Sequence, residues 1–570
     1  MRQYLPIINW LKNYKKEWIG GDLSAGLTVG VMLIPQGMAY AMLAGLPPIY
    51  GLYASTIPLI IYAIFGTSRQ LAVGPVAMVA LLISSGVGQF ADIGSSEFIT
   101  LAILLALMVG VIQFSMGLFR LGFIVNFLSH PVIAGFTSAA ALIIGFSQIK
   151  HLLGIEIPRG KVHETLINIV QNIENINLPT FLLGVAAIVT LLAVKRLNKR
   201  IPGPLIIVLL GIIGVYLFQL TSLGVNVVGE VPGGLPAFSF PMVNIELIQR
   251  LLPTALTISF IGFMESIAVA KAIQKKHKDY EIDNNQELIG LGLANIVGSF
   301  FKAFPVTGGF SRTAVNDQGG AKTGLAAIFS AILIIVTLLF LTDYFYNLPT
   351  AVLSAIIMVA VFGLIDVAEA KHLWQTDRRD FVLFMITAVG TLVLGIEEGI
   401  ILGAVLSLIV VIYNISYPHV AVLGRSKDGK IYRNIQRFED VQQLKEILII
   451  RFDAQLYFAN VNYFKDFVWA QVANTKNIQQ IILDARPINN IDSSGIHALK
   501  DLILDLRQKN IQFYMVDIKG PVRDKLQKGQ LIELIGKSHI LNNIPEAVNL
   551  IENASHPLDK NRGYATQTNV

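Results

Sequence analysis

The amino-acid sequence predicts an α-helical membrane protein with many crossings, followed by a small α/β module. Of its 570 residues, 54% are hydrophobic and only 14% are charged, and the mean hydropathy is +0.61. Soluble proteins carry more charge, so we expect most of this chain to contact lipid or other apolar helices. Many apolar segments reach about 17–22 residues, which is enough to cross a hydrocarbon core of roughly 30 Å. From about residue 435, short apolar runs instead alternate with helical patterns.

Composition also argues against several classes of protein. The chain contains no cysteine, so disulfides, thiolate catalysis and thiolate metal sites are excluded. Its formal charge of +6 is scattered among loops, which indicates topology signals and contacts with lipid headgroups rather than nucleic acid binding. The histidines lie outside the apolar segments and form no metal-binding pattern. We therefore expect a protein that is not an enzyme and has no cofactor, no metal and no nucleic acid partner.

The chain begins with a mixed polar and aromatic segment, residues 1–20. This segment has no apolar core followed by a cleavage site, so it is no signal peptide, and it predicts an amphipathic helix on the cytoplasmic membrane surface. About fourteen apolar segments follow between residues 21 and 418. They lie approximately at 22–44, 49–66, 72–89, 97–117, 123–147, 179–194, 204–220, 251–271, 287–301, 309–317, 324–342, 349–365, 380–395 and 397–414.

Charges in the loops predict the topology. Lysine and arginine follow the sixth, eighth and twelfth segments, within 195–200, 271–278 and 371–379, whereas the short loops of the opposite side contain neither. By the positive-inside rule both termini face the cytoplasm, in agreement with an even number of crossings. We expect a multi-pass protein of the cell (inner) membrane.

Two of the apolar segments are short and interrupted by glycine or proline. Leu71–Met78 (LAVGPVAM) is third in the first half, and Thr307–Val315 (TGGFSRTAV) is third in the second half. The halves would have opposite orientations, because each contains an odd number of crossings. Paired interruptions at equivalent places are typical of inverted-repeat transporters, whose substrate site lies between them. The alternative is that these are ordinary packing glycines.

The stretch Pro305–Arg312 (PVTGGFSR) carries the strongest functional signal. It places the permanently charged Arg312 beside Ser311 in a glycine-rich break between apolar segments. An arginine within a membrane segment usually has a functional role. Backbone N–H groups exposed at a helix break bind anions, and the arginine supplies the matching charge. These residues predict the binding and transport of an anion.

Glu265 is the other ionisable residue well inside an apolar segment. Burial favours a neutral carboxyl group whereas a nearby arginine favours the carboxylate, so this side chain can exchange protons. Two broken-helix N-termini contribute about +0.5 each, and Arg312 adds one charge. With Glu265 neutral, the site suits a divalent oxyanion, which is the logic of proton–anion symport. The alternative is a static ion pair between Arg312 and Glu265.

Gln36 and Tyr40 lie in Leu33–Tyr40 (LIPQGMAY), where a proline is expected to break the first segment. They are one helical turn apart and can offer an amide and a phenol to a ligand. Interhelical hydrogen bonds are the alternative. A further pattern, Gly319–Thr323 (GGAKT), is similar to a phosphate loop, but Ala321 replaces the required glycine and no strand precedes it.

Residues 435–555 predict a cytoplasmic α/β module. In its Asn490–Gly495 loop (NIDSSG), Ser493 or Ser494 is expected to cap a helix, and an exposed serine there could also be phosphorylated. The polar tail 556–570 is expected to be disordered. Strands are expected at 446–452, 480–484 and 511–517, with helices near 460–474, 494–509, 519–529 and 544–552.

These features together resemble the sulfate permease (SulP) family of anion transporters with a C-terminal STAS domain. The resemblance extends over nearly the whole chain and includes a STAS-like module with an Asp-Ser-Ser-Gly loop. The motifs that match are Pro48–Ser55 (PIYGLYAS), Gly66–Arg69 (GTSR), Gln36–Tyr40, Val73–Pro75, Asp283–Leu288 (DNNQEL), Ser311–Arg312 and Gly320–Thr323.

The resemblance implies a 7+7 inverted repeat of about fourteen transmembrane segments, divided into core and gate domains, with the anion between segments three and ten. Family members are typically homodimers with contacts between STAS domains. Glu265 matches the acidic position of proton-coupled members, and Ser493 matches a serine that is phosphorylated in stand-alone STAS proteins. The implied anion ligands are Gln36, Tyr40, the backbone around Val76 and Ala77, and Phe310, Ser311 and Arg312.

We therefore predict a secondary active anion transporter, with proton-coupled sulfate uptake by alternating access as its expected activity. Its expected partners are a small inorganic anion, a coupling proton, membrane lipids and a second copy of the chain. One alternative is sodium-coupled uptake of bicarbonate or another small anion. A nucleobase permease of related fold is a further alternative, which Arg312 disfavours. A membrane-anchored STAS signalling or binding protein is the alternative from a different class.

Overall fold

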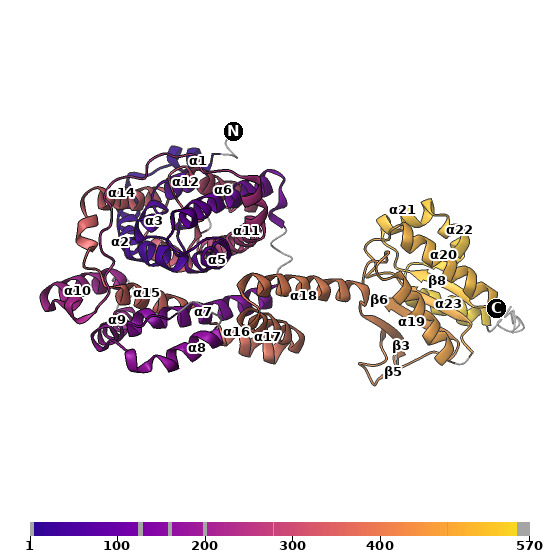
Figure 1. The fold of residues 1–570 in the computed structure, drawn as a ribbon. Helices are drawn as coiled ribbons and strands as arrows, with labels where there is room; N and C mark the ends of the chain where they lie inside the picture. Colours follow the sequence, from indigo (N-terminus) through magenta and orange to yellow (C-terminus); the bar gives the residue numbers. More distant parts are fainter. Residues whose placement is uncertain are drawn as a thin grey trace, which may run out of the picture. The chain divides into compact units, whose positions relative to one another are not determined.

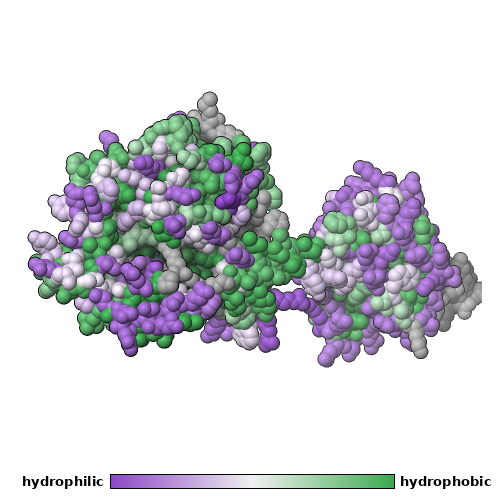
Figure 2. All heavy atoms as spheres, in the orientation of Figure 1, coloured by the Kyte–Doolittle hydropathy of each residue, from purple (hydrophilic) through white to green (hydrophobic). Residues whose placement is uncertain are grey.

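The computed structural model describes residues 5–123, 129–157, 162–197, 202–277, 279–429, 431–475 and 477–555. The chain divides into two compact units, Met1–Leu408 and Ile409–Val570. Hydrophobic residues gather on the first unit, whereas hydrophilic residues cover most of the visible face of the second (Figure 2). The tail expected to be disordered, 556–570, and the basic residues at 199, 200 and 278 lie outside the described residues.

Long apolar helices build the first unit, because a helix satisfies its backbone groups internally and can therefore face lipid. Among the described residues, seven helices are long and apolar enough to cross a membrane, and four more are shorter and apolar. The first half contains α1 (Pro6–Lys12), α2 (Ile19–Ala44), α3 (Pro48–Tyr53), α4 (Ile57–Phe65), α5 (Ala77–Val87), α6 (Ser96–Leu118), α7 (His130–Leu153), α8 (Val162–Gln171), α9 (Leu178–Leu197) and α10 (Gly203–Phe218).

The second half repeats this order. In each half a two-residue strand leads into the short third segment: β1 (Val73–Gly74) precedes α5, and β2 (Thr307–Gly308) precedes α13. These are the two interrupted segments that the sequence predicts. The remaining helices are α11 (Ile245–Gln274), α12 (Asn284–Ser299), α13 (Phe310–Gln318), α14 (Leu325–Phe340), α15 (Thr350–Phe362), α16 (Val367–Thr376), α17 (Arg378–Val393) and α18 (Ile396–Ser416).

The helices of the first unit form two bundles (Figure 1). The core bundle contains α2–α6 and α11–α14, and the gate bundle contains α7–α10 and α15–α17. Equivalent helices of the two halves make equivalent contacts, as an inverted repeat requires. In the core bundle the packing of α2 on α14 is matched by that of α11 on α6, and in the gate bundle the packing of α7 on α17 is matched by that of α15 on α9.

Two membrane helices differ from their predicted form. α2 runs unbroken through Pro35, although the proline was expected to break it. Proline removes one backbone hydrogen bond from a helix interior, and packing of α2 on α14 and α5 keeps the helix continuous. α7 begins only at His130, where Pro131 occupies the first turn, rather than at 123. The sequence pattern also omits α8 and α16, which are short and too polar to resemble spanning segments.

The second unit contains a seven-stranded sheet of order β4-β3-β6-β7-β8-β9, with β5 paired to β3. β3 pairs antiparallel with β6, and β6 to β9 are parallel neighbours. The sheet therefore starts before residue 435, because β3 follows the last membrane helix so closely that the sequence pattern does not set it apart. The strands are β3 (Val420–Ser426), β4 (Tyr432–Asn434), β5 (Val441–Gln442), β6 (Ile447–Phe452), β7 (Gln480–Asp484), β8 (Gln512–Val516) and β9 (Ile540–Leu541).

Helices cover both faces of this sheet. On one face Phe452 packs with Phe464, and on the other Ile482 packs with Val548. The predicted strands and helices of this unit are present, with ends that shift by a few residues. The helices are α19 (Val461–Asn474), α20 (Ser493–Gln508), α21 (Gly520–Lys528) and α22 (Leu531–Ile535) on the first face, and α23 (Ile544–Ser555) on the second.

Candidate functional site

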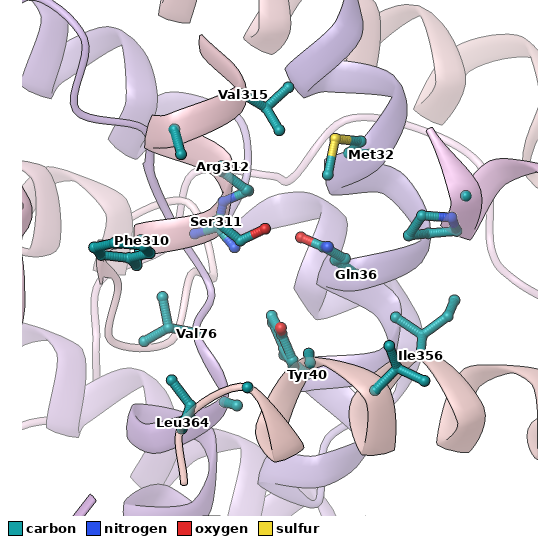
Figure 3. Close-up of a pocket in the computed structure, with 18 of the residues that line it drawn as sticks. Met32, Gln36, Tyr40, Val76, Phe310, Ser311, Arg312, Val315, Ile356 and Leu364 are labelled. Carbon is teal, nitrogen blue, oxygen red and sulfur yellow. The ribbon is translucent and has the colours of Figure 1, made fainter. Parts of the chain in front are cut away.

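A cavity of about 480 Å³ lies between the core and gate bundles (Figure 3). Its core side brings together all eight residues that the sequence assigns to the anion and the proton. These are Gln36 and Tyr40 from α2, Val76 and Ala77 at the start of α5, Glu265 from α11, and Phe310, Ser311 and Arg312 at the start of α13. The gate side is apolar, with Leu191 and Val194 from α9 and Ile356, Val359 and Ala360 from α15.

The crossing of β1 and β2 places two helix N-termini at this cavity. The strands pair antiparallel, with Val73 opposite Gly308 and Gly74 opposite Thr307. α5 and α13 begin directly after them, and neither helix has a side-chain cap. The first N–H groups of a helix lack intrahelical partners and carry partial positive charge. The two stubs therefore add to the positive potential of the cavity.

Arg312 lies in the first turn of α13 and is only 2% exposed. Its Nε and Nη2 atoms are buried and have no hydrogen bond partner among the described residues. The guanidinium rests against two glycines, since a Cβ atom would lie 2.7 Å from Nη2 if added to Gly309 and 3.5 Å if added to Gly74. A buried charge without a partner is unfavourable. These two nitrogens are therefore available to bind an anionic ligand.

Glu265 faces the same cavity from α11. Its Oε2 atom is buried and also lacks a hydrogen bond partner in the described part of the chain. No ion pair joins this carboxyl group to Arg312 in that part. The static ion pair that the sequence left open is therefore not formed in this structure.

Gln36 and Tyr40 lie one turn apart on α2 and are both almost fully buried. Figure 3 shows both side chains pointing into the cavity, with Gln36 directed toward Ser311 and Arg312. Within the described ranges neither side chain forms a hydrogen bond with another helix, which was the alternative interpretation. Their amide and hydroxyl groups can therefore bind a ligand beside the guanidinium.

Hydrogen bonds from α11 hold β2 in place. The backbone N–H of Gly308 donates to Ser266 Oγ at 2.8 Å, and this hydroxyl lies 2.6 Å from Thr307 Oγ1. Thr307 Oγ1 donates its own proton to the carbonyl of Gly262 at 2.5 Å. The donor in the hydrogen bond between the two hydroxyls is therefore Ser266 Oγ. Ser266 directly follows Glu265. The acidic residue of the cavity and the residue that binds β2 are therefore neighbours on α11.

Some residues of the motifs that resemble the family support the cavity without lining it. Glu287 is fully buried and accepts a hydrogen bond from the Tyr62 hydroxyl at 2.6 Å. It also accepts from the backbone N–H groups of Thr67 and Ser68 at 2.6 and 2.9 Å. These bonds fix the loop that leads into β1. The GTSR motif therefore helps to position the N-terminus of α5.

The Gly319–Thr323 pattern binds a carboxylate of the same chain. Asp22 Oδ1 accepts the backbone N–H groups of Lys322 and Thr323 at 2.6 and 3.0 Å, and its Oδ2 accepts the Thr323 hydroxyl at 2.7 Å. Asp22 is fully buried. The loop therefore ties the end of α13 to the start of α2, and its N–H groups are occupied.

The sequence does not predict the apolar residues of the gate side, which we call the gate wall. It also does not predict Met32 and Gln318 on the core side. The residues of the wall belong to ordinary apolar helices whose pattern fits lipid contact as well as a cavity. Gln318 ends a short segment whose polar residues draw attention only after Arg312 is known to face inward. Tertiary packing alone distinguishes these positions.

The cap of α20 differs from its prediction. Asp492, rather than Ser493 or Ser494, is the N-cap, and its Oδ1 accepts the N–H of Gly495 at 2.7 Å. Its Oδ2 also accepts the N–H of Phe458 at 3.1 Å. A carboxylate can accept both bonds at once, which a serine hydroxyl does less well. Ser493 is exposed in the first helical turn.

Among the described residues, no group of three or more His, Cys, Asp or Glu side chains could hold a metal ion.

A protein-family model described as "Sulfate permease family" matches residues 19–387, and one described as "STAS domain" matches residues 439–547. The two matches fall on the first and second units, respectively.

Curated relatives and solved structures match over most of the chain. Sulfate transporter 4.1, chloroplastic, of Arabidopsis thaliana is 43% identical over 563 residues, which covers 95% of this chain and 82% of the relative. High affinity sulfate transporter 2 of Stylosanthes hamata is 34% identical over 571 residues, which covers 96% and 86%. The structure of the murine Solute Carrier 26 family member A9 anion transporter in the inward-facing state has a TM-score of 0.89 at 29% identity, and the match covers 96% of this chain and 94% of that chain.

Proposed function

Because the chain belongs to the sulfate permease family, we propose that it is a secondary active transporter that takes up sulfate together with a proton. One observation carries this proposal. Nε and Nη2 of Arg312 are buried, have no hydrogen bond partner among the described residues, and lie at a cavity between two bundles, where two uncapped helices begin. This arrangement suits an anion. A cavity between two bundles is also a place from which a membrane transporter can load and release its substrate.

The charge of the cavity supports a divalent oxyanion. Two helix N-termini contribute about half a charge each, and Arg312 contributes one. Gln36, Tyr40 and Ser311 add neutral donors to the same space. A tetrahedral oxyanion such as sulfate has four acceptor oxygens that match donors arriving from several directions. The sulfate transporters among the relatives agree with this substrate.

Glu265 is the proposed proton carrier. Its carboxyl group lies in the anion cavity without a hydrogen bond partner for Oε2 in the described residues. When it is ionised it repels a dianion, and when it is protonated this repulsion disappears. Binding of a proton therefore strengthens the binding of sulfate, and by linkage sulfate strengthens the binding of the proton.

The distribution of polar groups supports alternating access by movement of the core bundle. All proposed ligands lie on the core bundle, whereas the facing residues of α9 and α15 are apolar. A smooth apolar wall makes no polar bonds that would have to break when the core bundle slides past it. The anion would travel with the core bundle and meet water on each side in turn.

The remaining proposals concern topology and assembly. Basic loops favour cytoplasmic placement of both termini, in a protein of the cell (inner) membrane. Labelling of single cysteines, added at each end, with an impermeant maleimide tests this topology.

We propose a homodimer with contacts between STAS domains. Measurement of the mass of the protein in detergent tests this assembly. Ser493, exposed at the start of α20, is the proposed phosphorylation site, and mass spectrometry of the protein from its host tests that assignment.

Sodium-coupled uptake of bicarbonate is the second candidate. It is favoured if Glu265 stays ionised, because the cavity then keeps about one positive charge and suits a monoanion.

Two measurements separate the candidates. They are the uptake of labelled sulfate into proteoliposomes and the currents on a solid-supported membrane over an anion panel. Sulfate uptake driven by an inward proton gradient and indifferent to sodium is expected. Uptake that follows sodium and bicarbonate, or ignores a pH gradient, would contradict the proposal, and binding without flux would indicate a signalling protein.

A further inference from the structure

We propose that residues 235–245 form an aromatic anchor that inserts into the lipid–water interface at one end of the core bundle. This segment leads from the α10–α11 connection into the first residue of α11 and lies outside the anion cavity. Phe240 is 79% exposed, and its neighbours are similarly open. The large apolar side chains exposed in the segment are Leu235, Phe238, Phe240, Met242, Val243 and Ile245.

The anchor is fixed to the ends of membrane helices. The N–H of Gly234 donates to the carbonyl of Leu338 in α14 at 2.8 Å, and the N–H of Ser239 donates to the carbonyl of Phe300 at 2.8 Å. The ring of Phe238 stacks on that of Phe300 at 5.7 Å between centroids. The exposed rings are therefore held in place at the end of α12, and they do not belong to a loose loop.

The surface around the anchor is also apolar. Exposed apolar residues continue from it along α11, at Leu252 and Leu256, and along the end of α14, at Leu339 and Phe340. In a multi-pass membrane protein such exposed helix surfaces face acyl chains. An apolar patch of this kind in water would be unfavourable. The anchor therefore continues a lipid-facing surface up to the boundary with water.

The composition of the segment fits this boundary. Residues 231–245 contain no charged side chain and include Pro232, Pro236 and Pro241. Proline has no N–H group, so fewer backbone donors are left without partners in an apolar environment. Aromatic rings are enriched at the level of the lipid headgroups. Because the segment lacks charge, the anchor should insert into zwitterionic lipid and need no anionic headgroup.

Spin labelling tests this proposal directly, because the chain has no cysteine of its own. Phe240→Cys and Met242→Cys are each labelled with a nitroxide in the full-length protein, in phosphatidylcholine vesicles. Collisions with oxygen, which concentrates in lipid, are compared with collisions with a nickel chelate, which stays in water. Asp505→Cys on α20 of the second unit, where the native side chain is charged and exposed, serves as the control for a site in water.

We expect the ratio of oxygen to nickel collisions at both anchor positions to exceed that of the control several-fold. The same ratio is expected after anionic lipid is added. Met242 makes no ring contact with Phe300, so its replacement leaves the packing of the rings intact. A ratio equal to that of the control would place the segment in water and overturn the proposal. Exclusion of both reagents would show that a protein surface covers it, which also overturns the proposal.

Discussion

Arg312 and Glu265 line one cavity, yet no ion pair joins them in the described part of the chain. Arg312 keeps two buried polar atoms, and Glu265 keeps one, without a hydrogen bond partner there. A closed ion pair would satisfy both groups and leave only the partial charges of the two helix N-termini to attract an anion. The separated arrangement is unfavourable while the site is empty, and both an anion and a proton relieve it. This arrangement is the physical basis of the proton coupling that we propose.

Replacing Arg312 by glutamine is expected to reduce sulfate affinity by roughly 30-fold or more, because truncating one partner of a buried charge pair costs about 2–5 kcal/mol. Arg312→Lys should recover only part of the loss, since lysine lacks the planar fork of donors. Binding to the purified protein and uptake into proteoliposomes measure both effects. Arg250→Gln, at an exposed arginine paired with Glu246, is the control and should bind sulfate normally. Normal affinity in Arg312→Gln would remove this residue from the site.

Glu265→Gln is expected to abolish the pH dependence of sulfate binding while sulfate exchange persists. In the natural protein affinity should rise as the pH falls, because protonation removes the negative charge that repels the dianion. The glutamine side chain is always neutral, so the variant should keep the high affinity of the protonated form at every pH. Isotope exchange and gradient-driven uptake are measured between pH 5 and 8. If the variant still responds to a proton gradient as the natural protein does, Glu265 is not the coupling residue.

Gly309→Ala is expected to weaken sulfate binding without unfolding the protein. The new methyl group would lie 2.7 Å from Nη2 and 2.9 Å from Cζ of Arg312, so the guanidinium must move. The clash involves the end of a flexible side chain, and the effect on thermal stability should therefore be small. Gly214→Ala in α10 is the matched control, because a Cβ atom there meets nothing within 4 Å. Equal sulfate affinity in the two variants would show that the position of the guanidinium does not matter.

Asp492→Ala is expected to lower the stability of the second unit by about 1–2 kcal/mol, because the loss of a helix N-cap has a cost of this size. Ser493→Ala should leave stability unchanged, since the serine hydroxyl is not the cap. Chemical denaturation, followed by circular dichroism, compares the variants. A larger loss in Ser493→Ala than in Asp492→Ala would contradict the assignment of the cap.

The sequence predicts much of this fold because lipid allows few solutions. Long apolar runs must become helices, and interruptions such as Val73–Pro75 and Thr307–Gly309 must lie where protein surrounds them. Positions that depend on packing are less predictable. Pro35 signals a break from sequence alone, yet α2 continues through it. Only Tyr417, Pro418 and His419 separate β3 from α18, so its pairing with β6 is what reveals it as a strand.

The candidate site is predictable where a residue conflicts with its surroundings. Arg312 and Glu265 stand out because charge is rare in apolar segments, and the structure places both at the cavity. Ile356 and Val359 do not stand out, because nothing in an apolar helix distinguishes a gate wall from a lipid-facing surface. Ser493 looks like a cap because serine often is one, whereas the neighbouring Asp492 accepts the hydrogen bonds.

Ser266 is expected to set the position of the anion site through β2. Ser266→Ala leaves the N–H of Gly308 without its acceptor, and an unsatisfied buried donor costs about 1–3 kcal/mol. We expect the stub to shift and the KM for sulfate to rise about 10-fold, whereas Ser266→Thr should restore most of the affinity.

The matched control is Ser259→Ala, on the same helix, because its hydroxyl is also buried and donates mainly to the carbonyl of Ala255 at 2.6 Å. Both alanine variants should lose some thermal stability, but only Ser266→Ala should change the KM for sulfate. A purely structural role for Ser266 predicts equal effects of the two variants on stability and no difference in KM. Uptake kinetics at several sulfate concentrations, set beside melting temperatures, distinguish these outcomes, because a shift of the α13 stub changes binding while the helices remain folded.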